Sequence, residues 1–213
     1  MARPEAAAVV ALVLGGGHSR RFGQEKGLAD WRGLSLVDHV LQRLPDPRQG
    51  TLLALRAEQS ADWKNADWAG RDEVEIIHDH QAHAGPLRGV IRGLEHLHDN
   101  GRAKWAWVVA CDQPLVNANL LRALLGVVTP ATLAVVPEWD GRLQPLTGLY
   151  HVDAASQLRA WHDRGETSLV RALANIGHQT FPAAKCREHD PRGLGFKNIN
   201  RPADLDELAR MLK

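Results

Sequence analysis

The sequence has little that would suggest a disulfide-stabilised or metal-cluster protein. Its 213 residues include only two cysteines, Cys111 and Cys186, and no CxxC motif. Small secreted domains that depend on disulfides carry many more cysteines. Three histidines, His78, His80 and His83, lie close together, but their spacing matches no zinc signature. We therefore expect a chain that works in a reducing cytoplasm without a structural zinc site.

An excess of charge of one sign and a membrane-spanning apolar run are also missing. Lys and Arg number 26 against 25 Asp and Glu, with no basic cluster. This balance argues against nucleic acid and anionic membranes as partners and favours a small-molecule substrate. The apolar start follows Arg3 and Glu5 and runs directly into a glycine loop, so it predicts a first strand, not a signal peptide.

Short apolar runs bounded by turn residues are typical of strands buried on both faces of a parallel sheet. They occur at residues 8–14, 51–55, 74–77, 105–111 and 133–136, and helical periodicity lies between them at residues 36–44, 87–97 and 120–125. This alternation predicts a three-layer α/β/α fold with a doubly wound, mostly parallel, Rossmann-like sheet. The length fits a single domain, residues 1–213.

The alternation of strand and helix patterns stops after residue 136, where Pro137, Gly141 and Pro145 break the regular structure. An apolar run at 146–152 and a helical pattern at 153–164 follow. We expect this part to form an antiparallel edge of the sheet and part of an acceptor site. At the C-terminus, Pro202 suits the first turn of a last helix, with Asn200 at or near its cap.

The first strand runs into a loop, GGGHSRRFGQEK, whose glycines allow the backbone to approach an anionic ligand. It matches neither the Walker A spacing nor the GxGxxG fingerprint, so the glycines alone are also compatible with a tight turn. Arg20, Arg21 and Lys26 add cations that would offset triphosphate charge, with Lys26 the first choice to stabilise a leaving pyrophosphate. The arginines are equally compatible with solvated loop charges.

Asp112 ends the strand predicted at residues 105–111, and Pro114 follows it. Its carboxylate would lie at the carboxyl edge of the sheet, where open α/β proteins bind ligands. A carboxylate beside triphosphate oxygens is how Mg²⁺ is commonly held, although an aspartate here would also suit the cap of the next turn. The neighbouring Cys111 ends an apolar strand and is interpreted as a packing residue.

Four ordered motifs, LGGGHSRRFGQEKGL, HDHQAHAGPLRGVIRGL, VVACDQPLV and KNINRPADLDEL, resemble those of the molybdenum cofactor guanylyltransferases and related molybdopterin and sugar nucleotidyltransferases. The resemblance spans nearly the whole chain. It covers the family's LAGGxSxRMGxDK loop, GPLAG turn, PCDxP magnesium motif and NxNTPEDL stretch. This combination is much more specific than any glycine loop.

The resemblance assigns roles to individual positions. It implies that the nucleotide binds at Leu14, Gly15, Gly16, Lys26, Asp79 and Asp112, with Asp112 also holding Mg²⁺. It implies that Asn198 and Asn200 lie near the metal or the acceptor phosphate. Lys26, Asp112 and Arg21 are the predicted catalytic residues.

Departures from the family motifs include Gly15 in place of alanine, Phe22 in place of methionine, Glu25 in place of aspartate and Arg201 in place of threonine. In addition, residues 52–56 lack the asparagine that contacts the nucleotide in many relatives. The leading hypothesis is transfer of GMP from GTP to the molybdopterin cofactor, with transient contact to molybdopterin-loading proteins or a molybdoenzyme. Two alternatives stay open, cytidylyl transfer to the same cofactor and a non-catalytic nucleotide-binding accessory protein.

Overall fold

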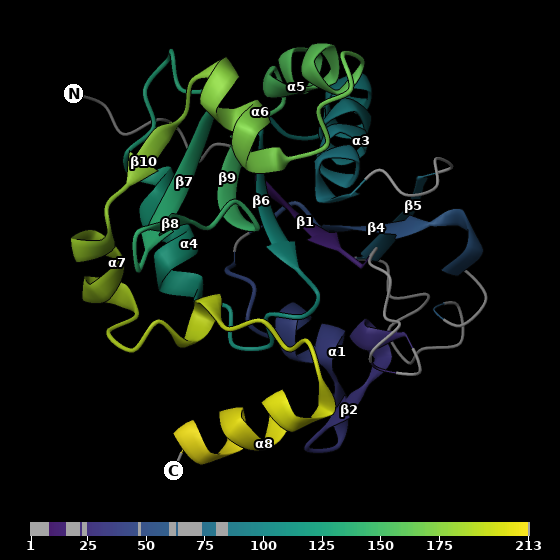
Figure 1. Cartoon of the computed structure of the whole chain (residues 1–213). Helices are drawn as coiled ribbons and strands as arrows, with labels where there is room; N and C mark the ends of the chain where they lie inside the picture. The colour runs from purple at the N-terminus through teal and green to yellow at the C-terminus, as the bar shows by residue number, and fades with distance from the viewer. Residues whose placement is uncertain are drawn as a thin grey trace.

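The structure is a computed structural model that describes residues 9–15, 22, 25–46, 48–59, 63, 74–79 and 85–212. Gly16 and Arg21, both predicted site residues, lie outside this part of the chain, as do Arg20, His80 and His83. Figure 1 shows one central sheet with helices packed against it. No helix within the described ranges is long and apolar enough to cross a membrane.

The central sheet confirms the predicted α/β fold and its mostly parallel strands. The strands along it follow the order β10-β7-β9-β6-β1-β4-β5, and β8 pairs with β7 beside this path. Their bounds are β1 Val9–Leu14, β4 Thr51–Arg56, β5 Val74–Asp79, β6 Trp105–Ala110, β7 Ala134–Trp139, β8 Arg142–Leu143, β9 Thr147–His151 and β10 Gln179–Phe181. Strands β6, β1, β4 and β5 pair in parallel, so their carboxyl ends share one edge.

Helices cover both faces of the sheet, as the doubly wound prediction requires. One face packs against α3 Gly85–Asn100, α5 Ala154–His162 and α6 Leu169–Ile176. The other packs against α1 Leu36–Leu41, α4 Ala118–Leu125 and α7 Ala183–His189. Figure 1 shows α3, α5 and α6 grouped together, well away from α1.

Strand β1 shows why these apolar runs form buried strands. Alternate side chains of a strand point to opposite faces of the sheet. Val9, Ala11 and Val13 therefore pack into the core beneath α1 and α4, while Val10 and Leu12 pack into the core beneath α3. Because both faces are buried, every position must be apolar, and a continuous run results.

The antiparallel part of the sheet corrects one prediction. Strand β9 pairs antiparallel with both β6 and β7 and thus lies inside the sheet, not at its edge. The chain turns at Asp140 and Gly141, both with positive φ, and returns through β8. The edge is instead formed by β10, which pairs in parallel with β7. Turn residues show where a chain reverses, but they do not show between which strands the returning strand inserts.

The remaining elements lie near one end of the sheet. They are the short helices η1 Lys26–Leu28, η2 Ala57–Gln59 and η3 Leu194–Phe196, the two-stranded β2 Asp30–Trp31 and β3 Leu34–Ser35, and α8 Pro202–Met211. Pro202 occupies the first turn of α8, as predicted, and Arg201 is its N-cap with Asn200 one residue before. A small separate core contains Ala29, Trp31, Leu36, Ile199 and Leu208 and joins α8 to β2 and α1.

Candidate active site

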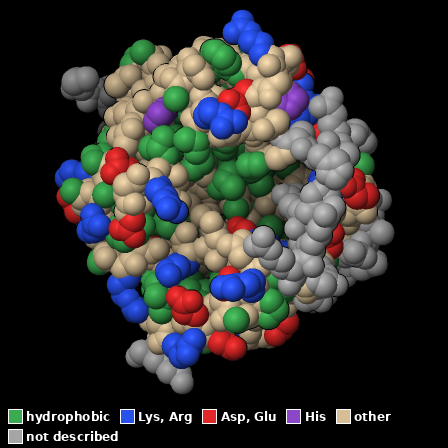
Figure 2. Space-filling view, in the orientation of Figure 1, with side chains coloured by type: hydrophobic (Ala, Val, Ile, Leu, Met, Phe, Trp, Pro, Cys, Tyr) green, Lys and Arg blue, Asp and Glu red, His purple; other side chains and the backbone are tan. Residues whose placement is uncertain are grey.

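The carboxyl edge of the parallel strands brings together residues from four strands. Leu14 ends β1, Arg56 ends β4, Asp79 ends β5, and Asp112 follows β6 by two residues. Register pairs Leu14 with Ala54 and Ala110, and Arg56 with Asp79. Figure 2 shows that the surface is hollowed near the centre of this view, between the regions of α6 and α8. The predicted ligand edge is therefore formed by the expected strands.

The backbone around Asp112 is fixed from two sides. Cys111 N donates to Leu14 O at 3.1 Å, which ties the end of β6 to the end of β1. Ile199 N donates to Asp112 O at 2.9 Å, which ties the same turn to the segment before α8. The side chain of Asp112 remains 18% exposed. A carboxylate is thus held in place at the edge while its oxygens stay within reach of a ligand.

Lys26 points toward this carboxylate from the other side of the site. Its Nζ lies 2.6 Å from Asp112 Oδ2 and donates to Asn200 Oδ1 at 3.1 Å. The Lys26 side chain is also 18% exposed. Three predicted site residues, separated by 86 and 174 positions along the chain, therefore form one cluster. A charge-assisted bond of this length is among the stronger hydrogen bonds in proteins.

Two glycines allow the Lys26 loop to pack closely against the sheet. A Cβ on Gly15 would lie 2.5 Å from Leu55 Cδ2, and a Cβ on Gly27 would lie 2.8 Å from Trp63 Cζ2. The indole of Trp63 is fully buried and lies close to both positions. Glycine at position 15 thus matches this packing, because an alanine there would require the Leu55 side chain to shift.

Glu25 links the Lys26 loop to the strand ends. Its Oε2 accepts a hydrogen bond from Gln59 Nε2 at 2.5 Å, and Arg56 Nη2 lies 3.8 Å from its Oε1. Gln59, which is almost completely buried, also donates to Gly15 O at 3.3 Å. The longer side chain at position 25 therefore reaches a buried amide. The segment of β4 that lacks an asparagine ends in Arg56, whose backbone N donates to Gln59 Oε1 at 3.0 Å.

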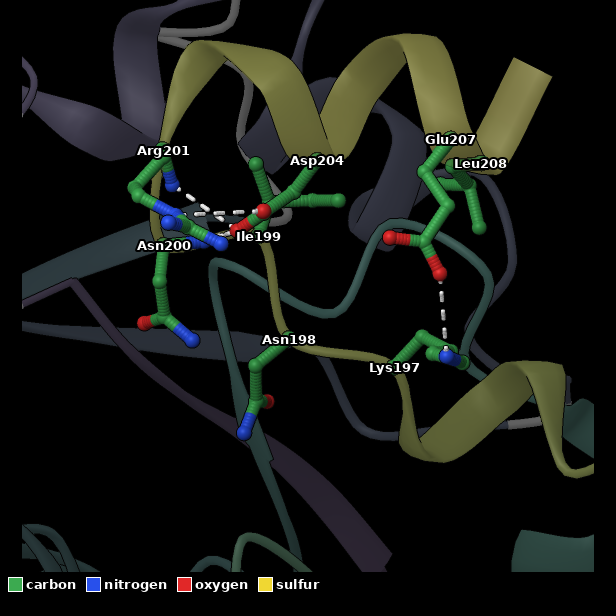
Figure 3. Close-up of a pocket in the computed structure, with 8 residues that line it drawn as sticks. All are labelled: Lys197, Asn198, Ile199, Asn200, Arg201, Asp204, Glu207 and Leu208. Carbon is green, nitrogen blue, oxygen red and sulfur yellow. Dashed lines mark hydrogen bonds and ion pairs between the residues drawn. The ribbon is translucent and has the colours of Figure 1, made fainter. Parts of the chain in front are cut away.

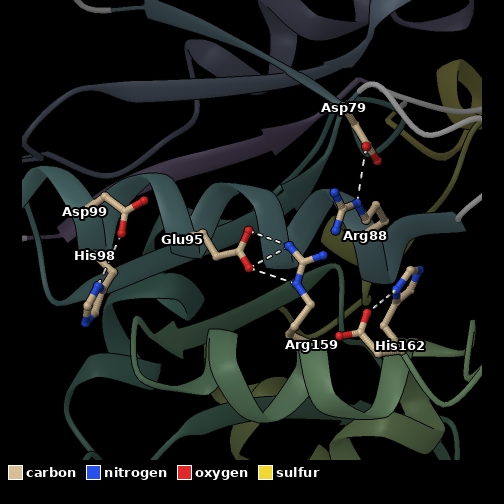
Figure 4. A network of polar contacts seen from close by, with 8 residues as sticks. Asp79, Arg88, Glu95, His98, Asp99, Arg159 and His162 are labelled. Atoms are coloured by element: carbon tan, nitrogen blue, oxygen red, sulfur yellow. Dashed lines mark hydrogen bonds and ion pairs between the residues drawn. The ribbon is translucent and has the colours of Figure 1, made fainter.

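Asp79 is held by a residue that the sequence analysis did not select. Arg88, in the first turn of α3, donates from Nε to Asp79 Oδ1 at 3.3 Å, and both side chains are nearly buried. Figure 4 shows this pair at the Asp79 end of α3. Arg88 lies in the GPLRG segment, where the family motif GPLAG has alanine. That difference was the only sequence signal that could have singled it out.

Asn198 and Asn200 lie in the extended segment between η3 and α8. Figure 3 shows that their amide groups point the same way, away from α8. They line a pocket together with Lys197, Ile199, Arg201, Asp204, Glu207 and Leu208. Asn200 reaches Lys26, whereas the structure records no contact of Asn198 with Lys26 or Asp112 in the described ranges.

Asp204 replaces the capping function that a threonine at position 201 would supply. Its Oδ2 accepts from the backbone N of Asn200 at 2.7 Å and of Arg201 at 2.9 Å. Desolvation acts to raise the pKa of this carboxyl, but the two backbone donors and the charge of Arg201 lower it below its usual value overall. The start of α8, and with it Asn200, is therefore fixed without a hydroxyl cap.

Cys111 is confirmed as a packing residue. Its thiol is buried, and burial, followed by the nearby Asp112 charge, raises its pKa far above the usual range. A thiol of this kind is not a nucleophile near neutral pH. Lys26 acts in the opposite direction on the same pKa but is outweighed.

The donor set at Asp112 fits Mg²⁺. No group of three or more His, Cys, Asp or Glu side chains suited to a metal ion occurs in the described residues. Mg²⁺ in nucleotide sites usually binds through one or two carboxylates, water and substrate phosphates, and it does not require a protein cage. One partly exposed carboxylate beside an ammonium group is consistent with that mode of binding.

Comparisons with known proteins identify the family of the chain. Residues 11–178 match the model of the MobA-like NTP transferase domain. The molybdenum cofactor guanylyltransferase of Pseudomonas putida is 32% identical over 92% of this chain and 95% of its own length. The probable molybdenum cofactor guanylyltransferase of Bacillus cytotoxicus is 29% identical over 94% and 96%.

A solved structure has a similar fold. Molybdopterin-guanine dinucleotide biosynthesis protein A from Archaeoglobus fulgidus superposes with a TM-score of 0.78 and 28% identity. The alignment covers 96% of this chain and 98% of that one. The family match, the identities and the shared fold lead to one conclusion. The chain is a nucleotidyltransferase that belongs to the MobA-like NTP transferase family.

Proposed function

We propose that the protein transfers GMP from GTP to the terminal phosphate of the molybdopterin cofactor, forming the guanine dinucleotide cofactor and releasing pyrophosphate. The names of the relatives from Pseudomonas putida and Archaeoglobus fulgidus support this acceptor and this base. The single observation that carries the proposal is the cluster of Lys26, Asp112 and Asn200 at the carboxyl edge of the sheet.

In this proposal, an acceptor phosphate oxygen forms a bond to the α-phosphorus of GTP while the bond from that phosphorus to the bridging oxygen of pyrophosphate breaks. A phosphate monoester has a second pKa of about 6, so the acceptor is already anionic at neutral pH. No general base is required. Catalysis then depends on bringing two anions together in line and on stabilising the charge of the leaving group.

The side chains in the cluster divide these tasks. Asp112 would hold Mg²⁺, which supplies Lewis-acid stabilisation of phosphate oxygens. Lys26 would turn from Asp112 to the triphosphate and offset charge on the leaving pyrophosphate. Asn200, and Asn198 beside it, would orient the acceptor phosphate through their amide groups. We keep Arg21, Gly16 and the backbone of Gly15 as proposed partners of the phosphates.

An assay of pyrophosphate release tests the proposal. Purified protein is incubated with Mg²⁺, molybdopterin cofactor and either GTP or CTP, and the dinucleotide product is identified by mass spectrometry. We expect turnover with GTP that requires both the cofactor and Mg²⁺. Turnover with CTP alone would support the cytidylyl alternative. Nucleotide binding without pyrophosphate release would support the accessory-protein alternative and contradict the proposed reaction.

We also infer a cytoplasmic location, a single domain and transient contact with molybdopterin-loading proteins or a molybdoenzyme. Two buried free thiols, Cys111 and Cys186, support a reducing compartment. The contact is inferred because the proposed product is a cofactor that a molybdoenzyme would take up. A pull-down with a loaded molybdopterin-binding protein, at increasing salt, would measure such a contact.

A further inference from the structure

Another ion pair lies at the carboxyl edge of the sheet, between Asp79 and Arg88. Arg88 Nε lies 3.3 Å from Asp79 Oδ1, and the two side chains are only 12% and 11% exposed. Figure 4 shows the pair apart from the Glu95 and Arg159 pair, which lies farther along α3. Removing water from an ion pair that is buried to this degree costs free energy, and this cost can cancel the attraction between the two charges. Stabilisation of the fold alone therefore does not explain the pair.

This pair lies beside the end of β1. Gly89, the next residue after Arg88, is packed so closely on Leu14 that a Cβ would lie 3.2 Å from Leu14 Cδ2. Asp79 is in register with Arg56, at the end of the neighbouring strand β4. The first turn of α3 therefore lies at the same edge as the Lys26 and Asp112 pair, displaced toward β5.

Arg88 has further N–H groups besides the Nε–H that it donates to Asp79. Its Nη1 is buried and has no hydrogen-bond partner within the part of the chain that the structure describes. Buried donors are almost always paired, and exceptions call for an explanation such as a ligand. Because Nη1 is buried, the guanidinium would rotate about the side-chain bonds next to it to place a donor against a base.

Facing a base, the two side chains would present their hydrogen-bonding groups in a defined order. The guanidinium is a donor only, and the two oxygens of the carboxylate are acceptors only. Donor, acceptor, acceptor is the order along the pairing edge of cytosine. Guanine presents the complementary order, with O6 as an acceptor followed by the N1–H and N2–H₂ donors.

We propose that Arg88 is a specificity-determining residue that, with Asp79, selects guanine over cytosine. Arg88 donates to O6 while it holds the Asp79 carboxylate against N1–H and N2–H₂. The inference rests on the proposed function, since it assumes that this edge binds a nucleoside triphosphate. It goes further by naming the residues that choose the base.

The same pair disfavours the competing bases. Cytosine would place its N3 and O2 acceptors against the carboxylate, and adenine would place its N1 acceptor there. Uracil offers one donor between two acceptors, so one acceptor meets the carboxylate. A site of buried polar groups rejects a ligand that leaves them unpaired or faces them with like partners.

The test compares nucleotide affinities of wild type, Arg88→Met and Arg88→Lys by calorimetry with Mg²⁺ and either GTP or CTP. We expect wild type to prefer GTP. Arg88→Met should weaken GTP binding by about tenfold to a hundredfold, because it removes the donor to O6 and the partner of Asp79. CTP binding should change by less than about twofold, and Arg88→Lys should restore part of the preference.

Arg102→Met is the matched control. Arg102 Nη1 donates to Glu75 Oε2 at 2.9 Å, so it also pairs with a carboxylate of β5, but near the opposite end of the strand. This variant should keep the GTP preference, and melting curves of all variants show whether each is folded. If Arg88→Met lost GTP and CTP affinity equally, or if both Arg88 variants kept the full preference for GTP, the role of Arg88 would be wrong. The proposed guanylyl transfer would still stand. Wild type with no GTP preference would overturn the proposed guanylyl transfer itself.

Discussion

Lys26 Nζ and Asp112 Oδ2 are 2.6 Å apart, although 86 positions separate the two residues in the sequence. Each charge therefore neutralises the other. A nucleoside triphosphate with its cation offers both groups a stronger partner, with phosphates for the ammonium and metal for the carboxylate. The pair holds both side chains together at the proposed reaction centre.

The first prediction concerns the carboxylate of this pair. Asp112→Ala should lower kcat by about 10³-fold or more, since it removes the proposed metal ligand. The melting temperature should change little, because partly exposed ion pairs contribute only about 0–1 kcal/mol. Steady-state pyrophosphate release and a thermal melt measure the two effects.

Glu95→Ala is the control for that variant. Glu95 pairs with Arg159 at 2.6 Å, and these side chains are 28% and 27% exposed, against 18% for both Lys26 and Asp112. It should keep most of the activity because it lies between α3 and α5, away from the strand ends. Near-normal turnover in Asp112→Ala would rule out the metal assignment.

The second prediction concerns the packing beneath Lys26. Gly27→Ala forces a Cβ into the Trp63 indole and within 3.2 Å of Cys111 Sγ. Overpacking of this kind costs about 1–3 kcal/mol. We expect a lower midpoint in urea and a loss of activity, because Lys26 is the adjacent residue.

Gly126→Ala serves as the comparison, since Gly126 has ordinary helical dihedrals at the end of α4. Among the described residues, the one atom recorded within 4 Å of a Cβ there is Ala123 O, at 3.3 Å. This variant should leave activity intact. Combining Gly27→Ala with Trp63→Leu should recover part of the lost stability, which a double-mutant cycle would measure as coupling. Strictly additive effects would mean that the indole is not the cause.

The third prediction concerns the docking of α8. Leu208 is 2% exposed and packs with Trp31, Leu36 and Ile199. Leu208→Ala should cost about 2–4 kcal/mol of docking free energy. Amide hydrogen exchange in α8 should accelerate, and kcat should fall because Asn200 loses its position beside Lys26. Leu212→Ala, at an exposed leucine in the turn after α8, should change neither quantity; equal exchange in both variants would contradict the prediction.

The fourth prediction concerns pH. The Arg171 guanidinium and the backbone N of Ser168 and Thr167 lower the pKa of Glu166 to about 2 from its usual 4.5. A lowered folded-state pKa means that the stabilisation is complete above about pH 4.5 and is lost as the pH falls toward 2. Wild type should melt ~1–2 °C above Glu166→Gln at pH 7, with the difference shrinking below pH 4.5.

Glu188→Gln provides the reference for this series, because Glu188 pairs only with exposed Lys185 among the recorded ion pairs of the described chain. Its melting temperature should follow wild type over the whole range. A Glu166→Gln difference that grew in acid would contradict the assigned sign.

Much of the site could be predicted because its residues lie in motifs at the ends of apolar runs. Asp112 directly follows such a run, and the lysine-bearing loop follows another. The parallel pairing of β1 and β6 then brings both to one edge. Gln59, Trp63 and Arg88 could not be predicted in the same way. Each acts through contacts with residues distant in sequence, and no local pattern marks such contacts.

The sequence by itself determined the α/β alternation and the parallel strands, because hydrophobic periodicity is a local property. Its resemblance to the family motifs selected Lys26, Asp79, Asp112 and Asn200 as candidate site residues. Only the tertiary structure decided that β9 lies inside the sheet, that Lys26 pairs with Asp112 and Asn200, and that Arg88 holds Asp79. These relationships depend on which surfaces pack together. Packing is decided by the shape and charge of the whole chain, and it cannot be assigned to any one segment.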